Sequence, residues 1–183
     1  MKVSLFCLVF SIPLLFNPSS LTEQETLHQS DQLPSFSKSQ ALFYFGYVAY
    51  QAKAYNKALV AFRQFITDYP EDILLDYAYF YSGMCLMESS LYEEARKMFD
   101  RLKTDFPESL LLTDIEFFIA DSYYFQEKYD TAIQQYLVLK KDKRYKKHRL
   151  LPELYLKLGH CYEQKKQFKT ARDVYHQAQF TFI

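Results

Sequence analysis

The octapeptide "YNKALVAF" at residues 55–62 combines an aromatic residue, an alanine three positions later and a second aromatic residue four positions after that. Closely similar motifs follow as "YEEARKMF" at 92–99, "YDTAIQQY" at 129–136 and "FKTARDVY" at 168–175. The alanines of the four motifs, which we take as reference positions, lie at intervals of 37, 37 and 39 residues and are Ala58, Ala95, Ala132 and Ala171. A motif that recurs in register at such intervals predicts four copies of one supersecondary unit.

A small residue precedes each reference alanine by twelve positions, and these residues are Gly46, Gly83, Ala120 and Gly159. They include all 3 glycines of the chain. In a helical hairpin, a small residue in the first helix allows the second helix to pack closely against it, with the alanine at the facing position. Pro70 and Pro107 follow the first two reference alanines and predict the end of the second helix. Each unit is therefore predicted to be a helical hairpin that buries its apolar face by stacking against the next hairpin.

The composition agrees with a helical, globular chain. Hydrophobic residues make up 49% and charged residues 24% of the 183 residues, which excludes a disordered chain. The low glycine count and the 19% of aromatic residues favour helices over a β-fold with many tight turns. Lys plus Arg and Asp plus Glu balance at 22 each, so no overall field favours nucleic acid as a partner.

These residues resemble the tetratricopeptide repeat (TPR) family, which carries Gly or Ala in its first helix and Ala, an aromatic residue and Pro in its second. The resemblance covers about residues 39–182 and implies an all-α solenoid, a right-handed superhelix of four repeats at about 39–72, 73–109, 110–147 and 150–183. The aromatic residue that the family carries early in the first helix is replaced by Glu116 in the third repeat. The long period and the "FPES" closure resemble bacterial cell-envelope TPR proteins: the barrel-assembly TPR lipoprotein, the Tol–Pal coordinator protein and the superhelical domain of lytic transglycosylases.

The N-terminal residues differ in character from the repeats. Lys2 precedes an apolar run at 3–16 and a polar exit, "NPSS", so residues 1–20 are typical of a secretory signal peptide. An uncleaved N-terminal anchor is the alternative. Residues 21–38 are polar and aperiodic, which predicts a flexible leader. We therefore expect export to the periplasm or the cell envelope, with the TPR domain at 39–183.

The resemblance also implies a partner-binding groove along one stripe of the first helices. By register, that stripe contains Phe43, Tyr47, Tyr50, Tyr77, Phe80, Met84, Met87, Phe117, Asp121, Tyr124 and His160. Tyrosines suit a groove because the ring can make contact while the hydroxyl stays hydrated, and methionines adapt to several partners. For Phe43, Phe80 and Phe117, at one shared position, core packing remains an equal alternative. The hypothesis is that the groove binds a mainly apolar peptide or a partner helix.

A basic run, "KKDKRYKKHR" at 140–149, lies where the repeat interval grows from 37 to 39 residues. One interpretation is a solvated loop that compensates nearby acidic residues. The other is a contact with an anionic membrane surface. The basic residues concerned are Lys140, Lys141, Lys143, Arg144, Lys146, Lys147 and Arg149.

The sequence contains no motif that supports catalysis, a cofactor or a metal site. The 4 histidines lack metal-ligand spacing, and every glycine occupies a helix-packing position rather than a phosphate loop. Cys85 and Cys161 share one helix position two repeats apart, which predicts two buried thiols without a disulfide between them. The chain also ends on Phe180, Phe182 and Ile183 without a capping helix. That apolar edge either docks onto another molecule, such as a second copy, or continues in a longer protein.

Together these features predict a non-catalytic protein-interaction scaffold of the cell envelope. The alternative function is a positioning arm of a peptidoglycan-cleaving enzyme of the lytic transglycosylase type.

Overall fold

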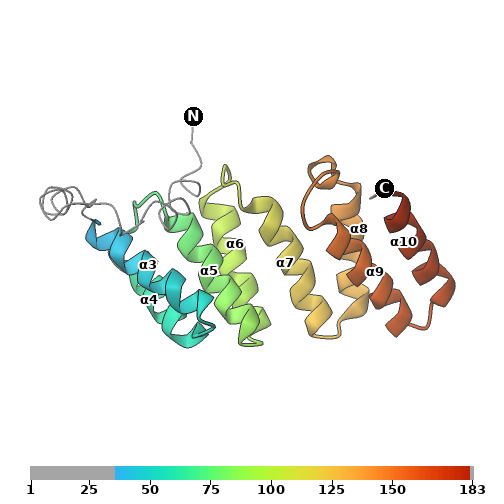
Figure 1. Ribbon diagram of the computed structural model, residues 1–183, viewed down its shortest axis with the longest axis horizontal. Helices are drawn as coiled ribbons and strands as arrows, with labels where there is room; N and C mark the ends of the chain where they lie inside the picture. Colours follow the sequence, from blue (N-terminus) through green and yellow to red (C-terminus); the bar gives the residue numbers. More distant parts are fainter. Residues whose placement is uncertain (1–35, 182–183) are drawn as a thin grey trace, which may run out of the picture. The chain divides into compact units, whose positions relative to one another are not determined.

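The computed structural model describes residues 36–181, which form eight α-helices, one short 3₁₀-helix and, within this range, no strand (Figure 1). The sequence-predicted segment 1–20 and most of the predicted leader lie outside the described residues. The helices form four consecutive hairpins: α3 (Lys38–Gln51) with α4 (Tyr55–Asp68), α5 (Leu75–Glu88) with α6 (Tyr92–Asp105), α7 (Leu112–Phe125) with α8 (Tyr129–Lys141), and α9 (Leu151–Gln164) with α10 (Phe168–Thr181). The 3₁₀-helix η3 (Lys143–Tyr145) lies between α8 and α9.

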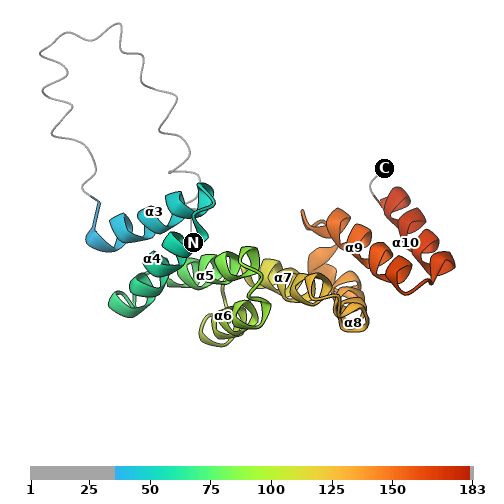
Figure 2. The ribbon, with the colours of Figure 1, turned by 90° about the horizontal axis from the view of Figure 1, so that it is seen from below.

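The hairpins stack side by side in chain order. The first helices α3, α5, α7 and α9, which we call the A layer, lie on one side, and α4, α6 and α8 lie behind them (Figure 2). Within the stack, α5, α7 and α9 each pack against the second helix of the preceding hairpin as well as against their own partner. None of the helices between residues 36 and 181 combines the length and apolarity that crossing a membrane requires.

The predicted helix crossings are confirmed. All four reference alanines are buried, as are Gly46, Gly83, Ala120 and Gly159 opposite them. A Cβ atom added to Gly46 would lie 2.9 Å from the Phe62 ring, and one added to Gly159 would lie 2.5 Å from Cζ of Tyr175. In the three hairpins with a glycine at this crossing, the aromatic residue four positions after the reference alanine therefore occupies the space that a side chain on the glycine would need.

The helix boundaries also follow the repeat. The second helices begin at Tyr55, Tyr92, Tyr129 and Phe168, the first residue of each recurring motif. In the first two hairpins the second helix ends two residues before Pro70 and Pro107, because proline cannot donate to a helical carbonyl and restricts the residue before it.

Each hairpin turn contains a residue in the left-handed region at the same position. The residues are Lys53, Ser90, Glu127 and Lys166, with φ between 58° and 60°. None is glycine, although a side chain in this region costs about 1 kcal/mol because its Cβ approaches the backbone. The turn geometry is thus imposed by the packing of the two helices that it joins.

Replacing Lys53 with glycine is expected to raise the free energy of unfolding by about 0.5–1 kcal/mol, because glycine adopts the left-handed region without that cost. Urea-induced unfolding followed by circular dichroism measures the change. The matched control is Gln64→Gly, at an exposed position in the interior of α4, which should lower stability by a similar amount. If both variants lose stability, the left-handed turn is absent.

Cys85 and Cys161, the cysteines of the part of the chain that the structure describes, lie in the core, on α5 and α9. Burial raises the pKa of the Cys85 and Cys161 thiols to about 12. Both are therefore protonated at neutral pH and act as small apolar core residues.

Candidate functional site

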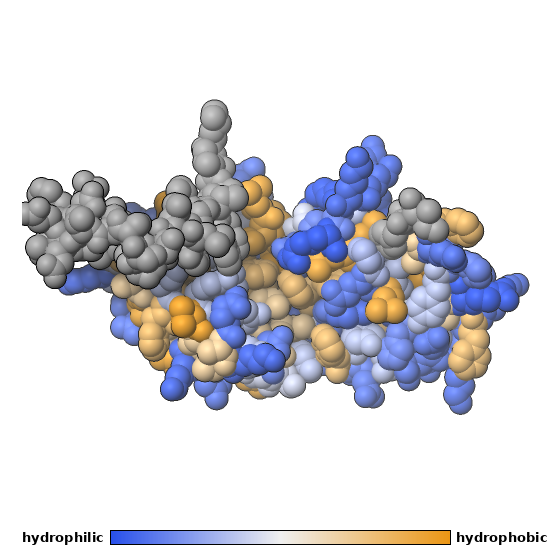
Figure 3. Space-filling view, viewed as in Figure 1, coloured by the Kyte–Doolittle hydropathy of each residue, from blue (hydrophilic) through white to orange (hydrophobic). Residues whose placement is uncertain are grey.

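A depression of about 350 Å³ opens on the A layer, where α5, α7 and α9 meet the start of α6. Its walls combine apolar and charged side chains from three hairpins, so no single hairpin could form it. The lining residues are Met84, Met87, Glu88, Ser90, Tyr92, Phe118, Asp121, Phe125, Glu153 and Lys157. Figure 3 shows apolar surface near the middle of this face and hydrophilic surface over the loop between α8 and α9.

A charged network closes the depression on the side of α9. The ammonium group of Lys157 forms an ion pair with the buried Asp121 carboxylate and a second one, at 2.9 Å, with Glu153. The Tyr136 hydroxyl donates to the other oxygen of Asp121 at 2.5 Å. This network ties α9 to α7 and α8, and it leaves no free amine or carboxylate at its centre.

Burial raises the pKa of Asp121, although Lys157 and the Tyr136 hydroxyl both favour the ionised form. Burial beside the same carboxylate raises the pKa of Tyr136 as well. The Lys157 ammonium also lies 4.9 Å from the ring centroid of Phe125 and 5.3 Å from that of Phe117. Lys157 thus joins two carboxylates and two aromatic rings from α7 and α9, so it is a structural anchor of the depression.

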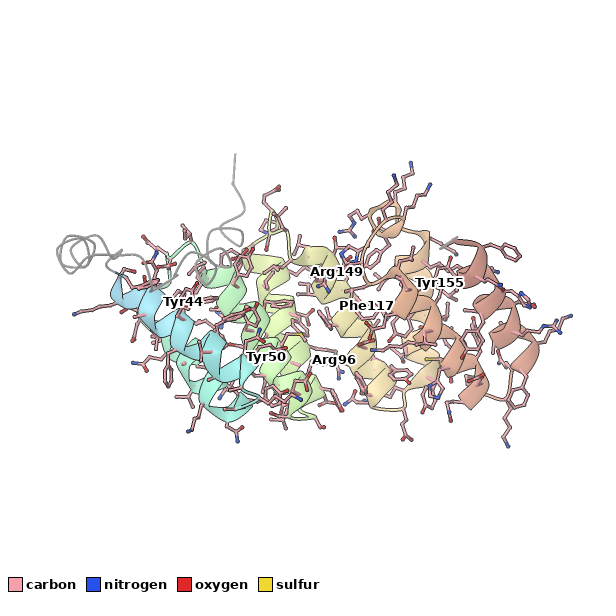
Figure 4. The ribbon with its side chains drawn as sticks, viewed as in Figure 1. Tyr44, Tyr50, Arg96, Phe117, Arg149 and Tyr155 are labelled. Atoms are coloured by element: carbon pink, nitrogen blue, oxygen red, sulfur yellow. The ribbon has the colours of Figure 1, made fainter. Side chains whose placement is uncertain are left out.

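A cluster of tyrosines continues the surface toward α3. The ring centroid of Tyr81 lies 5.3 Å from that of Tyr47 and 5.2 Å from that of Tyr50. Tyr47, Tyr50 and Tyr77 are half-buried, so each ring is supported by the core while one side remains accessible. Burial raises the pKa of Tyr50 to about 12. Tyr50, labelled in Figure 4, is therefore a neutral hydrogen-bonding aromatic side chain at physiological pH.

Phe43, Phe80 and Phe117 are all buried, so they pack in the core rather than line an open groove. Each ring contacts its own second helix: the Phe43 and Phe62 centroids are 5.5 Å apart, and Phe117 and Tyr136 are 6.0 Å apart. Each also contacts the next first helix, as Phe80 does with Phe118 at 5.9 Å. The equivalent residue of the last hairpin, Leu156, is exposed because no described helix follows it.

The remaining predicted groove residues are distributed between two places. Met84, Met87 and Asp121 line the depression, although Met87 and Asp121 are themselves largely buried. Tyr124 and His160 form a contact between α7 and α9, with the Tyr124 hydroxyl 2.8 Å from Nδ1 of His160. The other nitrogen of His160 lies 2.9 Å from Nε2 of Gln164. His160 is thus engaged in packing contacts.

Sequence reasoning missed three residues that shape this surface: Tyr81, Phe118 and Lys157. They occupy one equivalent position, immediately after Phe80, Phe117 and Leu156. Side chains at this position face the preceding first helix, as the contact of Tyr81 with Tyr47 shows. The spacing of these three residues from the reference alanines could have identified them as equivalent. They were missed because the candidate groove residues were taken only from the positions that line the groove in the family.

The basic run covers the last two residues of α8 and most of the loop before α9, and part of it pairs with acidic residues at the start of α7. Arg144 donates to Glu116 at 2.8 Å and to Asp142, and Arg149 donates to Asp114 at 2.7 Å. Arg149 is labelled in Figure 4. Glu116, which departs from the family pattern, therefore serves as an ion-pair partner instead of an aromatic core residue. Lys140 contacts Gln177 and the Tyr155 ring.

The loop is anchored by Tyr145, which is fully buried and donates to the Thr113 carbonyl oxygen. Tyr69 and Phe106 follow their reference alanines by eleven positions, and Tyr145 follows Ala132 by thirteen. Tyr145 is thus the aromatic residue of this position, displaced by the two extra residues of the interval. The lysines that extend from the loop into solvent are Lys141, Lys143, Lys146 and Lys147.

Residues 40–72 and 77–109 match the model of the tetratricopeptide repeat family. Among solved structures, the crystal structure of MamA matches with a TM-score of 0.63 and 16% identity, over 86% of this chain and 83% of that chain. The apo form of RapI matches with a TM-score of 0.68 and 16% identity, over 85% of this chain and 61% of that chain. At such identities these two structures share the fold. No curated protein sequence matches the chain.

Proposed function

Because the chain belongs to the tetratricopeptide repeat family, we propose that this non-catalytic protein-interaction scaffold binds a peptide or a helix of a partner protein on the A layer. The depression between α5, α7 and α9 carries the proposal, since it is contributed by three hairpins and lined by methionine and phenylalanine side chains. Such surfaces accept an apolar side chain of a partner and tolerate variation in its shape.

The charges around the depression suggest what accompanies that apolar side chain. Lys157 is already paired with Asp121 and Glu153, whereas Glu88 is an exposed carboxylate on the opposite wall. The charged residues that line the depression therefore carry a net negative charge. A partner that inserts an apolar side chain and carries a nearby lysine or arginine is therefore the best match.

Photo-crosslinking tests the proposal in the host cell. A benzoylphenylalanine at Phe125, on the rim of the depression, should give a covalent adduct with a partner protein. The same residue at the exposed Lys97 of α6, which does not line the depression, is the matched control. We expect the adduct from Phe125 alone and its loss when Met84→Glu is added. Absence of an adduct from Phe125, or the same adduct from Lys97, would contradict the proposal.

We also propose that the protein is exported to the cell envelope, on the strength of the charged, apolar and polar order of residues 1–20. Fractionation of host cells, with the mass of the purified protein, distinguishes a cleaved signal from an anchor. Recovery from the cytoplasm with residues 1–20 intact would exclude export.

The four solvent-facing lysines of the loop, Lys141, Lys143, Lys146 and Lys147, support a contact with an anionic membrane surface. Sedimentation with vesicles of anionic lipid should then be salt-sensitive and should weaken when these lysines are replaced by glutamine. If the wild type and the glutamine variant sediment equally with the vesicles, the lysines do not bind the membrane and the loop only pairs with α7.

The C-terminal edge is a second surface that we propose for a partner. Phe168 and Phe180 are exposed there, and a hollow of about 300 Å³ lies on the outer face of α10. Its rim carries Arg172, His176 and Glu163, so this edge favours a partner with polar as well as apolar groups. Loss of a captured partner on replacing Phe168 with glutamate, with the A-layer adduct retained, would separate the two surfaces.

A further inference from the structure

The first hairpin carries a face that every later hairpin buries. Three positions of the first helix are occupied in the later hairpins by Ala78, Ser82 and Cys85, by Ile115, Ile119 and Ser122, and by Leu154, Leu158 and Cys161. Apart from the half-buried Ile119, all are buried. At one of these junctions, Arg96 of α6 donates to the Ser122 hydroxyl at 2.8 Å, which shows that this face meets the preceding second helix.

In α3 the same positions are exposed. They are Ala41, Phe45 and Val48, and the exposed fraction of both Phe45 and Val48 is 61%. Ala52, the exposed residue that directly follows α3, extends the stripe by four positions. The spacing of four, three and four residues is that of a seam between two packed helices. The large residues of this seam exceed in size the serine and cysteine that α5 buries at the equivalent positions.

The sequence of the stripe is nearly the same in both directions: small, large, large, small. A two-fold axis between Phe45 and Val48, perpendicular to α3, would bring Ala41 of one chain opposite Ala52 of a second chain and Phe45 opposite Val48. The exposed side of α3 carries one charged residue, Lys38, at its first position, so no like charges would meet along the seam. We propose that two copies of the chain associate through α3, with the helices antiparallel and related by a two-fold axis.

The alternative contact between two copies, α10 of one against α3 of the other, is less favourable. Docking α10 of one copy onto α3 of another would repeat the three internal junctions, and Arg172 would take the place of Leu59, Arg96 and Ile133. Arg96 is accommodated because Ser122 and Gln126 accept its hydrogen bonds. Val48 and Ala52 stand at those positions in α3 and offer no side-chain acceptor, so a buried Arg172 would lose its hydration without compensation.

The proposed dimer leaves the depression on α5, α7 and α9 accessible and does not depend on the partner-binding function. It would present two such depressions on one particle, which increases the apparent affinity for a partner that carries two binding segments. A single helix pair buries less area than a standard interface, so the dimer should be reversible and its population should depend on concentration.

Sedimentation velocity of the full chain over a range of concentrations tests the association. We expect a concentration-dependent dimer and at least a tenfold weaker association for Phe45→Glu with Val48→Glu. The matched control is Leu156→Glu with Phe168→Glu, two exposed apolar residues at the opposite end, which should leave the dimer unchanged. Circular dichroism verifies that both variants remain folded. A wild-type monomer at every concentration, or loss of the dimer in the control only, would overturn the proposal.

Cysteine pairs test the two-fold arrangement itself. In a Cys7→Ser background, Ala41→Cys chains mixed with Ala52→Cys chains should form a disulfide-linked dimer under mild oxidation. Each variant alone should not, because the axis separates like positions by about 16 Å along the helix. The native Cys85 and Cys161 are buried and do not compete. Crosslinking of Ala41→Cys chains alone, or none in the mixture, would overturn the antiparallel arrangement.

Discussion

Replacing Gly83 with alanine is expected to lower the free energy of unfolding by about 1–3 kcal/mol, although alanine favours a helix more than glycine does. The added Cβ would lie 2.8 Å from two atoms of the Phe99 ring and closer still to a third. Phe99 is fully buried between α5 and its neighbours, so the ring cannot move aside without displacing the next hairpin. Urea-induced unfolding measures the loss.

Two comparisons show whether the Phe99 ring is the cause. Gly46→Ala should lower the free energy of unfolding less than Gly83→Ala does, because its Cβ would lie 2.9 Å or more from the Phe62 ring. Adding Phe99→Leu to Gly83→Ala should cost less than the sum of the two single changes, since the smaller side chain makes room for the methyl group. If the losses of stability of the two single variants simply add in the double variant, residues 83 and 99 are not in contact at this helix crossing.

Replacing Lys157 with methionine is expected to destabilise the fold by about 3 kcal/mol at neutral pH, because it leaves the buried Asp121 carboxylate without its ammonium partner. Asp121→Asn should cost less. The amide can still accept from the Tyr136 hydroxyl, and Lys157 keeps Glu153 at 2.9 Å. Denaturant unfolding of both variants beside the wild type provides the comparison.

The loss in the Lys157→Met variant should depend on pH. Burial already raises the pKa of Asp121 in the folded chain, and removing the ammonium raises it further. The folded state then binds a proton more tightly than the unfolded state. The stability linked to this proton is therefore fully present below the ordinary aspartate pKa and is lost as the pH rises through the folded pKa. The deficit relative to wild type should be smaller at pH 4 than at pH 8. A deficit independent of pH would mean that Asp121 is not the group left unpaired.

The fold could be predicted from the sequence because its main determinants are local and repeated. A small residue opposite an aromatic ring, as Gly83 is opposite Phe99, allows two helices to pack closely, and the repeat places glycine there three times and alanine once. The start of each second helix follows from the same register. Such features depend on contacts within one hairpin.

The candidate site was harder to predict because its residues depend on neighbouring hairpins. Phe80 is buried because Phe118 of the next hairpin covers it, whereas Leu156 at the same position is exposed. Lys157 could not be recognised from periodicity, since its role depends on Asp121 of the preceding hairpin. The burial of Tyr145 likewise could not be predicted from periodicity, since this residue lies two positions later than Tyr69 and Phe106 in their repeats.

We propose that the A-layer depression is the surface on which this scaffold binds its partner. The partner protein identified by crosslinking at position 125 can be titrated against the wild type, Met84→Glu and the exposed-surface control Lys97→Glu to measure its affinity for each. We expect at least tenfold weaker binding for Met84→Glu and unchanged binding for Lys97→Glu. Equal affinity of all three proteins would contradict it.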